Sequence, residues 1–391
     1  MNPEPKRLDL SLYFSREPVI LALLTGLAMV SFLAVAGLSR LFQAQQESLA
    51  AEWSTRGAQD LNAGRYERAI LEFRTALEHS RGDNSYQLSL AQALLGLNRT
   101  DEAYAYLINL WDKQPENGVV NLELARIAMS KNQTEQALRF YHNAIYATWP
   151  GNQETERRKA RLELIDYLLR INARTQAESE LIALEANSGD DAAEQTQLGN
   201  LFLKVQDNAR ALADFRESLK LDRRNAAAEA GAGVAAFNLG MYPTAERYLQ
   251  EAVAAAPDDV ASAALLKTTQ NVLRLDPYRP QIPVAQRNRI VVDAFNVAGE
   301  RLESCGLMAG AQLTAQQKRE ATLKTPAREL ADQWTKLKPQ ITERGLRSDP
   351  DLVNTAMNLA FGIENQKTAS CGEPTEADKA LALIANLHEE N

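Results

Sequence analysis

The sequence predicts an all-α protein whose central part is a solenoid of paired helices. Six alanines recur with separations of 34, 34, 40, 34 and 34 residues, at Ala69, Ala103, Ala137, Ala177, Ala211 and Ala245. A fixed period near 34 is typical of stacked helical hairpins. Around the first alanine, apolar residues from Tyr66 to Leu77 follow the i, i+3, i+4, i+7 spacing of an amphipathic helix. Strand signals are scarce, which supports the same fold class.

Each alanine lies within a recurring pattern of small and large residues. Four residues later comes an aromatic residue or leucine: Phe73, Leu107, Tyr141, Leu181, Phe215 and Leu249. Twelve residues earlier comes a small or apolar residue: Gly57, Ala91, Ala125, Ile165, Gly199 and Gly233. We expect the small residues to mark where two helix axes approach closely, and the large residues to fill the space beside them.

The predicted turn between the two helices of each unit is marked five residues before the alanine. Gly or Asn occupies five of the six positions, which are Gly64, Asn98, Asn132, Asn172, Gln206 and Gly240. Both residue types accept the left-handed conformation that ends a helix. Prolines at Pro115, Pro150 and Pro257 indicate where a second helix stops.

The repeats resemble the tetratricopeptide repeat family. The first and last units carry its pattern best, with Trp53, Gly57, Gly64, Tyr66, Ala69, Phe73 and Ala76 in one, and Gly233, Gly240, Tyr242, Ala245, Leu249, Ala252 and Pro257 in the other. The resemblance spans residues 50–259 and implies six repeats in a right-handed solenoid. The middle units depart from it, with Thr100, Thr134, Arg174 and Asn208 where tyrosine is usual, and extra residues enter near 151–155.

An uncharged apolar stretch covers residues 18–38. A helix of this length crosses a hydrocarbon core of about 30 Å, so we expect a transmembrane helix here and a helical stalk over residues 39–49. A cleaved signal peptide is the alternative, because Ala34-Val35-Ala36 resembles a small-residue cleavage site. The length of the apolar run and the balanced charge of the preceding residues favour the uncleaved anchor.

Basic residues predict the orientation of this helix. Lys6, Arg7 and Arg16 precede the span, whereas only Arg40 follows it closely. Since basic residues favour the cytoplasmic side, we expect residues 1–17 to be cytoplasmic. The protein is then a single-pass protein of the inner (cytoplasmic) membrane with extracytoplasmic repeats, which lie in the periplasm if the cell is a Gram-negative bacterium.

Residues after the repeats are predicted to be helical apart from one linker. Residues 260–275 form an amphipathic helix that we interpret as the solenoid's cap. Three prolines within residues 276–285 predict an extended, stiff linker. Residues 286–391 resemble no family that we recognise and are expected to form a small helical domain, whose last helix starts with a capping box at Thr375 and Asp378.

The two cysteines, Cys305 and Cys371, both lie in this C-terminal region. In an oxidising compartment such a pair tends to form a disulfide, and we expect one here. Two separate buried thiols are the alternative.

The sequence predicts no catalytic residue, cofactor or metal site. Its histidines are far apart without the spacing of a zinc site, and no CxxC occurs. Residues 231–236 match the dinucleotide fingerprint GxGxxA, but that motif needs a preceding strand, and here it falls inside a predicted helix. With a net charge of -8 and no dense basic tract, we expect no nucleic-acid partner either.

The candidate binding surface follows from the resemblance, which assigns the first helix of each unit to a concave face. Four residues after the close-packing position, each unit has an apolar residue, together called the inner stripe: Leu61, Leu95, Met129, Leu169, Leu203 and Phe237. Arg126, Asp166, Arg170 and Lys204 flank it. The stripe either packs only against the neighbouring repeat or accepts an apolar or amphipathic segment of a partner.

Our functional hypothesis is a membrane-anchored, non-catalytic scaffold that holds other envelope proteins in place through its extracytoplasmic repeats. One alternative is that the repeats deliver a C-terminal enzyme or ligand-binding module to its substrate. Another is a secreted soluble binder, formed by cleavage at Ala36.

Overall fold

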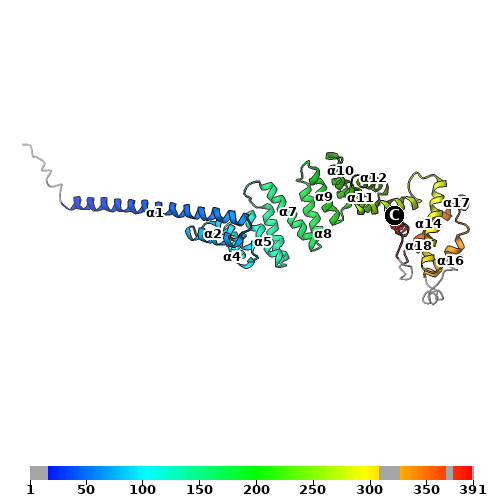
Figure 1. Ribbon diagram of the computed structural model, residues 1–391, viewed down its shortest axis with the longest axis horizontal. Coiled ribbons are helices and arrows are strands. Elements are labelled where there is room, and N and C mark those ends of the chain that lie inside the picture. The colour runs from blue at the N-terminus through cyan, green and yellow to red at the C-terminus, as the bar shows by residue number, and fades with distance from the viewer. Residues whose placement is uncertain (1–15, 308–325, 367–372, 390–391) are drawn as a thin grey trace, which may run out of the picture. The chain divides into compact units, whose positions relative to one another are not determined.

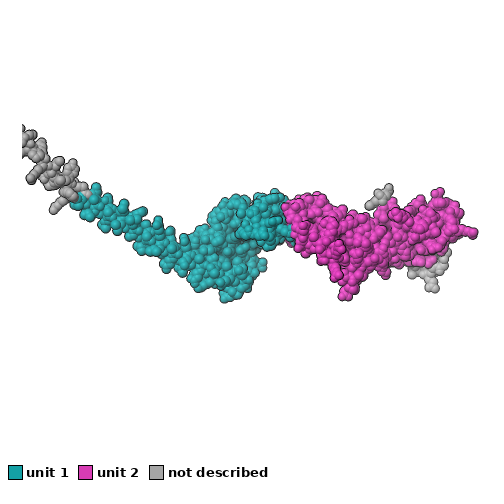
Figure 2. All heavy atoms as spheres, turned by 90° about the horizontal axis from the view of Figure 1, so that it is seen from above, with its two compact units in different colours: residues 1–167 teal, residues 168–391 magenta. Residues whose placement is uncertain are grey.

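The computed structural model describes residues 16–307, 326–366 and 373–389, and these are helical apart from turns and loops (Figure 1). Across the described ranges no strand occurs, and an isolated bridge pairs Asn117 with Thr148. The chain divides into two compact units, Met1–Tyr167 and Leu168–Asn391, shown in teal and magenta in Figure 2. The all-α class and the helical hairpins predicted from the sequence are confirmed.

The first helix, α1 (Arg16–Asn62), is continuous from the apolar stretch into the first hairpin, where it packs against α2 (Tyr66–His79). It therefore includes both the predicted transmembrane residues and the predicted stalk. None of its most apolar window is buried, and the Thr25 hydroxyl donates to the carbonyl four residues earlier at 2.8 Å. Its length and composition are compatible with a single-pass anchor or a signal sequence.

The remaining helices follow as antiparallel pairs in chain order. In the first unit these are α3 (Asn84–Gly96), α4 (Thr100–Lys113), α5 (Gly118–Ser130) and α6 (Thr134–Tyr146). The division between the units falls within α7 (Gln153–Arg170). The second unit continues with α8 (Arg174–Glu185), α9 (Ala192–Val205), α10 (Asn208–Leu221), α11 (Ala226–Asn238), α12 (Tyr242–Ala255) and α13 (Val260–Leu275).

The recurring alanines form the core of these hairpins. All six are 0% exposed, and the large residue that follows each by four positions is at most 1% exposed. In the first hairpin, a Cβ added at Gly57 would lie 2.9 Å from the ring of Phe73. The close-packing interpretation is therefore correct: a small residue on one helix leaves the space that a large residue on the next helix fills.

The turn inside each hairpin has the backbone conformation that the sequence predicts. All six turn residues have positive φ, from 57° at Asn98 and Asn132 to 70° at Gly64 and Gln206. Gln206 adopts this conformation although it is neither Gly nor Asn, and it ends α9 as its C-cap. The repeated backbone geometry therefore persists at the position where residue type alone was uninformative.

The 40-residue spacing between the third and fourth alanines comes mainly from α7, which has 18 residues where α5 has 13, and in part from a longer loop between α6 and α7. The Gly118 amide donates to the Thr148 carbonyl at 2.9 Å, which joins this loop to the start of α5. Trp149 packs over Gly118, and its indole N–H donates to the Ala144 carbonyl at 2.8 Å. Arg157 of α7 donates to the carbonyl of the residue after α6 at 2.9 Å. The insertion is thus a packed cap on the end of α6.

The C-terminal helices share one hydrophobic core with the last repeat. They are α14 (Val284–Ser304), α16 (Pro326–Leu337), α17 (Glu343–Ser348), α18 (Asp351–Glu364) and α19 (Glu376–Glu389). Their core includes Trp334 and Phe295 and continues to Leu275 of α13 and Tyr242 of α12. The predicted capping box is present, since the Asp378 amide donates to the Thr375 hydroxyl at 3.2 Å and the Thr375 amide donates to the Asp378 carboxylate at 2.7 Å.

The segment between α13 and α14 differs from the extended linker that its prolines predict. Residues 276–283 contain two turns, at 277–278 and 280–281. The Asp276 carboxylate is 5% exposed and accepts a hydrogen bond from the Tyr278 amide at 2.9 Å, which closes the first turn. The ring of Tyr278 lies 4.4 Å from that of His388 on α19. The segment folds back because its own side chains hold it against α19.

Candidate protein-binding surface

The inner stripe occupies one backbone position in every hairpin. Each of its six residues lies three positions before the left-handed turn residue, whose amide donates to the stripe residue's carbonyl at 2.9 to 3.1 Å. The side chains of all six are half-buried. A half-buried apolar side chain retains apolar surface that a partner can cover. The stripe is therefore a regular structural feature, fixed by the turn that follows it.

In the first unit, the flanking charges are engaged within the chain. Arg126 of α5 donates to both carboxylate oxygens of Glu163 on α7, at 3.0 and 2.6 Å, and to Glu123 at 3.1 Å. These hydrogen bonds hold the pKa of Arg126 above its usual value. The Tyr141 hydroxyl donates a hydrogen bond to the Met129 sulfur at 3.7 Å. Asp166 is exposed. Arg126 thus connects α5 to α7, the first helices of two successive hairpins. A partner would compete with Glu163 for the Arg126 guanidinium.

In the second unit, two stripe residues line one open groove. Leu203 and Phe237 belong to it, and its volume is about 720 Å³. Polar side chains at the helix ends, among them Asn208 and Asn238, form its rim. The side-chain amide of Asn238 donates to the side-chain oxygen of Asn208 at 3.0 Å. An apolar floor with amide groups beside it suits a peptide, whose backbone needs hydrogen-bond partners.

Other predicted residues of the second unit lie outside that groove's lining. Leu169 is half-buried, and Arg170 and Lys204 are exposed. The structure therefore brings together Leu203 and Phe237, and leaves Lys204 on the adjoining surface of α9.

Sequence models of known families match the hairpins on both sides of α7. Two tetratricopeptide repeat models cover residues 59–118 and 196–260, and residues 94–149. These hairpins are tetratricopeptide repeats. The matched residues stop in the α6–α7 loop and resume in α9, so the unmatched part includes α7, where the spacing is irregular.

Solved structures give weak but consistent similarity. YrrB, described as a tetratricopeptide repeat protein with an unusual peptide-binding site, is 18% identical over 49% of this chain and 95% of its own, with a TM-score of 0.39. A tetratricopeptide repeat-containing protein from Cytophaga hutchinsonii is 14% identical over 61% of this chain and 92% of its own, with a TM-score of 0.44. Pseudomonas aeruginosa pilF is 15% identical over 58% and 98%, with a TM-score of 0.40. No curated protein sequence matches.

The C-terminal helix contributes residues to the groove that the sequence analysis missed. Leu383, Asn386 and Leu387 of α19 line it together with the tetratricopeptide repeat residues. Leu387 lies close enough to Gly240 that a Cβ added there would be 2.8 Å from its Cδ1. No repeat period links these residues to the solenoid, so spacing alone could not place them at the groove.

The glycines of the dinucleotide-like motif have a packing role. Both lie inside α11, where a Cβ at Gly231 would overlap the ring of Phe215 and a Cβ at Gly233 would lie 2.7 Å from Leu249. The interpretation of Gly233 as a close-packing residue is confirmed. Within the described residues, no group of three potential metal ligands among His, Cys, Asp and Glu was found.

Proposed function

We propose that this protein is a membrane-anchored scaffold whose tetratricopeptide repeats hold other envelope proteins in place outside the cytoplasm, without catalysis of its own. Proteins with these repeats bind other proteins or peptides and are generally non-catalytic. The observation that carries the proposal is the inner stripe, since an apolar side chain recurs half-buried at the same position of every hairpin and opens into a groove at Leu203 and Phe237.

The membrane part of the proposal is supported by α1. A helix whose apolar segment is exposed needs lipid, detergent or removal by cleavage to be stable in a cell. Since the same helix enters the first hairpin without interruption, an anchor here would hold the repeats close to the membrane. We propose that residues 1–17 remain in the cytoplasm, as the distribution of basic residues indicates.

Substituting the stripe should release the partners. We expect the double variant Leu169→Asp and Leu203→Asp to lose crosslinked partners in intact cells, because a charged side chain there opposes burial against an apolar segment. The measurement is crosslinking followed by mass spectrometry of what is caught. A matched control is Leu71→Asp with Val260→Asp, which changes two residues that are 63% and 78% exposed.

The control should keep its partners, and both variants should keep the helicity of the unsubstituted protein by circular dichroism. If the stripe variant retains its full set of partners while folded, the inner stripe is not the binding surface.

The compartment can be tested through the cysteines. Cys305 is 5% exposed, and Cys371 lies outside the described residues, so their disulfide stays a prediction. Arg301, four residues before Cys305, donates to the carbonyl of Glu373, two residues after Cys371, at 3.5 Å. Residues 301 and 373 therefore lie close together, which supports the proposed disulfide.

We expect protein alkylated in intact cells to carry no label at either cysteine until it is reduced, and a reporter fused after residue 50 to be extracytoplasmic. In the chain-entropy model, closing the loop between the two cysteines with a disulfide would stabilise the C-terminal region by about 4 kcal/mol. Two thiols that are labelled without reduction, or a cytoplasmic reporter, contradict the proposed compartment.

A further inference from the structure

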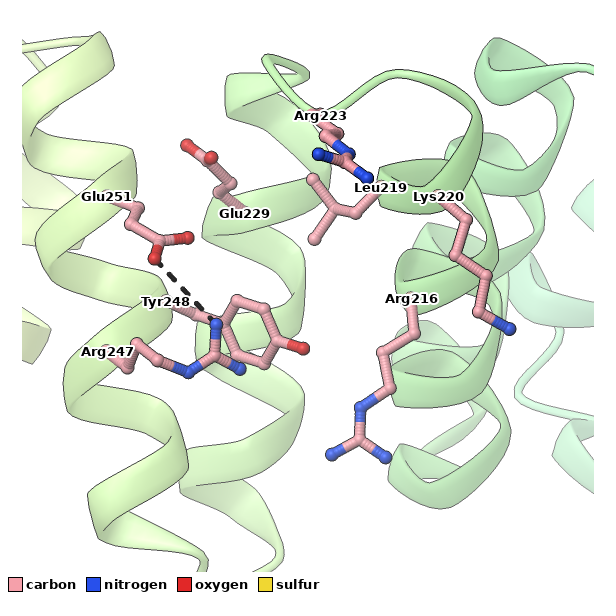
Figure 3. A pocket seen from close by; sticks show the side chains of 8 residues that line it. All are labelled: Arg216, Leu219, Lys220, Arg223, Glu229, Arg247, Tyr248 and Glu251. Carbon is pink, nitrogen blue, oxygen red and sulfur yellow. Dashed lines mark ion pairs between the residues drawn. The ribbon is translucent and has the colours of Figure 1, made fainter.

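A second groove lies away from the inner stripe, between the second helices of the last two hairpins. Its volume is about 640 Å³. Figure 3 shows Arg216 and Lys220 projecting from α10, with Arg223 on the turn that follows, and Arg247 and Tyr248 on α12 across the gap. Arg216 and Lys220 are four residues apart on α10, so they share one side of that helix. We call this site the basic groove.

Four cations and the two carboxylates of Glu229 and Glu251 line the groove, so its charges are only partly compensated. Lys220 pairs with Glu217 at 2.5 Å and Arg247 lies 3.8 Å from Glu251. Arg216 and Arg223, by contrast, have no ion pair or hydrogen bond from their side chains within the described part of the chain, and both are exposed. Arg210 on the same helix is paired, with Glu185 at 3.0 Å and Asp207 at 3.2 Å.

Arg216 and Arg223 line the same hollow, in a chain with a net charge of -8. They concentrate positive potential where the surface is hollowed, and such a site attracts an anionic group.

The walls of the groove provide more than charge. Arg247 stacks over Tyr248 at 4.0 Å from the ring centroid, which holds the guanidinium in place. Tyr248 is 6% exposed, and its hydroxyl has no hydrogen-bond partner among the described residues. Leu219 adds apolar surface between the cations of α10. Apolar and aromatic surface beside two free guanidinium groups fits a segment that carries both carboxylates and an apolar side chain.

We propose that the basic groove binds an acidic segment of a partner protein, separately from the inner stripe. The carboxylates of this segment pair with Arg216 and Arg223, and an apolar side chain between them covers the half-buried Leu219. Nucleic acid fits less well, since two free arginines neutralise few phosphates and the rest of the chain is acidic. A lipid headgroup supplies an anion, but no apolar side chain beside it to cover Leu219. The scaffold then contacts its partners through two chemically distinct surfaces.

The test uses the full chain in detergent and a fluorescein-labelled peptide of sequence EELEEFEE, with binding measured by fluorescence anisotropy. We expect binding that weakens with added salt and is lost when every glutamate of the peptide is replaced by glutamine. The double variant Arg216→Glu with Arg223→Glu should reduce the affinity for the peptide by at least about tenfold. Arg216→Gln with Arg223→Gln should weaken binding in the same direction, with circular dichroism confirming that each variant is folded.

The matched control is Arg274→Glu with Arg344→Glu, two exposed arginines elsewhere in the same unit, which should bind like the unsubstituted chain. Variants of the inner stripe should also bind the peptide normally, so this test can fail or succeed independently of the proposed function. Equal loss in both charge-reversal variants would indicate general electrostatic attraction and overturn the proposal. It is also overturned if the peptide does not bind, or if only phosphatidylserine vesicles bind in a manner that depends on Arg216 and Arg223.

Discussion

Trp334→Ala is expected to destabilise the second unit by about 3–5 kcal/mol, as removal of a buried tryptophan typically does. Trp334 is 2% exposed and stacks on Phe295 of α14, with ring centroids 5.3 Å apart and planes 9° from parallel. Its indole N–H donates to the Phe295 carbonyl at 2.9 Å. One side chain thus connects α16 to α14 by stacking, by a hydrogen bond and by filling the space over Gly299.

The free energy of unfolding should be measured by urea unfolding of the full chain, monitored by circular dichroism. Amide hydrogen exchange in α14 and α18 should be measured as well. Since the core continues to Leu275 and Tyr242, we expect faster exchange in α13 and α12 as well. Gly299→Ala tests the same contact and keeps the tryptophan as a fluorescent reporter, because its added Cβ would overlap the Trp334 ring. It should cost about 1–3 kcal/mol.

Asn296→Ala, on the exposed side of α14, is the matched control and should change the free energy of unfolding by less than about 0.5 kcal/mol. If Trp334→Ala has as small an effect as Asn296→Ala, then α16 is not packed on α14 as described. If exchange accelerates only in α16, the C-terminal helices do not share a cooperative core with the last repeat.

The repeats could be predicted from the sequence because each of their features is local. The alanine at the centre of a hairpin, the large residue four positions later and the left-handed turn residue five positions earlier all lie within a few turns of one another. The helix predicted over residues 260–275 is α13 with the same bounds, and its N-terminus is marked by Asp259, whose carboxylate accepts from two amides of the first turn.

Contacts between distant segments could not be predicted in this way. The packing of α19 beside Gly240 depends on the shape of Leu387, more than a hundred residues away, and no period connects the two. The turn at Asp276 was mistaken for an extended linker because its prolines indicate only what the backbone avoids. Its actual path is set by a carboxylate that bonds the Tyr278 amide and by the ring contact with His388.

The binding role of the candidate residues stays a prediction, and their surroundings could be predicted only in part. The spacing rule places each stripe residue three positions before a turn residue, where the structure has a left-handed turn. The same rule gave no information about partners of charged side chains. Arg126 is bonded to Glu163 on a helix that begins after the irregular loop, so its engagement depends on an insertion that breaks the period.

Glu364→Gln is expected to stabilise the second unit at alkaline pH and to have little effect at acid pH. One carboxylate oxygen of Glu364 on α18 is buried without a hydrogen-bond partner. Burial, and after it the negative charge of Asp378, raises the pKa of Glu364 from 4.5 to about 8, although Arg301 acts in the opposite direction. The folded protein therefore keeps a proton on Glu364 at pH values where the unfolded chain has released it.

The sign of the effect follows from this difference in bound protons. Below about pH 4.5 both states are protonated, and the raised pKa has no cost. As the pH rises towards 8 the unfolded chain gains stability from ionisation that the folded state does not share, so the free energy of unfolding falls. A shift from 4.5 to about 8 corresponds to about 5 kcal/mol if fully expressed. The side chain is partly exposed, which reduces our expectation to about 2–3 kcal/mol.

The measurement is the difference in the free energy of unfolding between Glu364→Gln and the unsubstituted chain, at several values from about pH 5 to about pH 9. Burial also raises the pKa of Asp214, to about 7, so the free energy of unfolding of either protein falls with pH partly because of Asp214. The difference between the two proteins cancels this contribution. A difference that stays constant across this range contradicts the assignment to Glu364. Because Asp378 lies in the first turn of α19, amide exchange should slow most in α18 and α19 of the variant at high pH. The same slowing across the repeats would mean that the substitution acts through some other group.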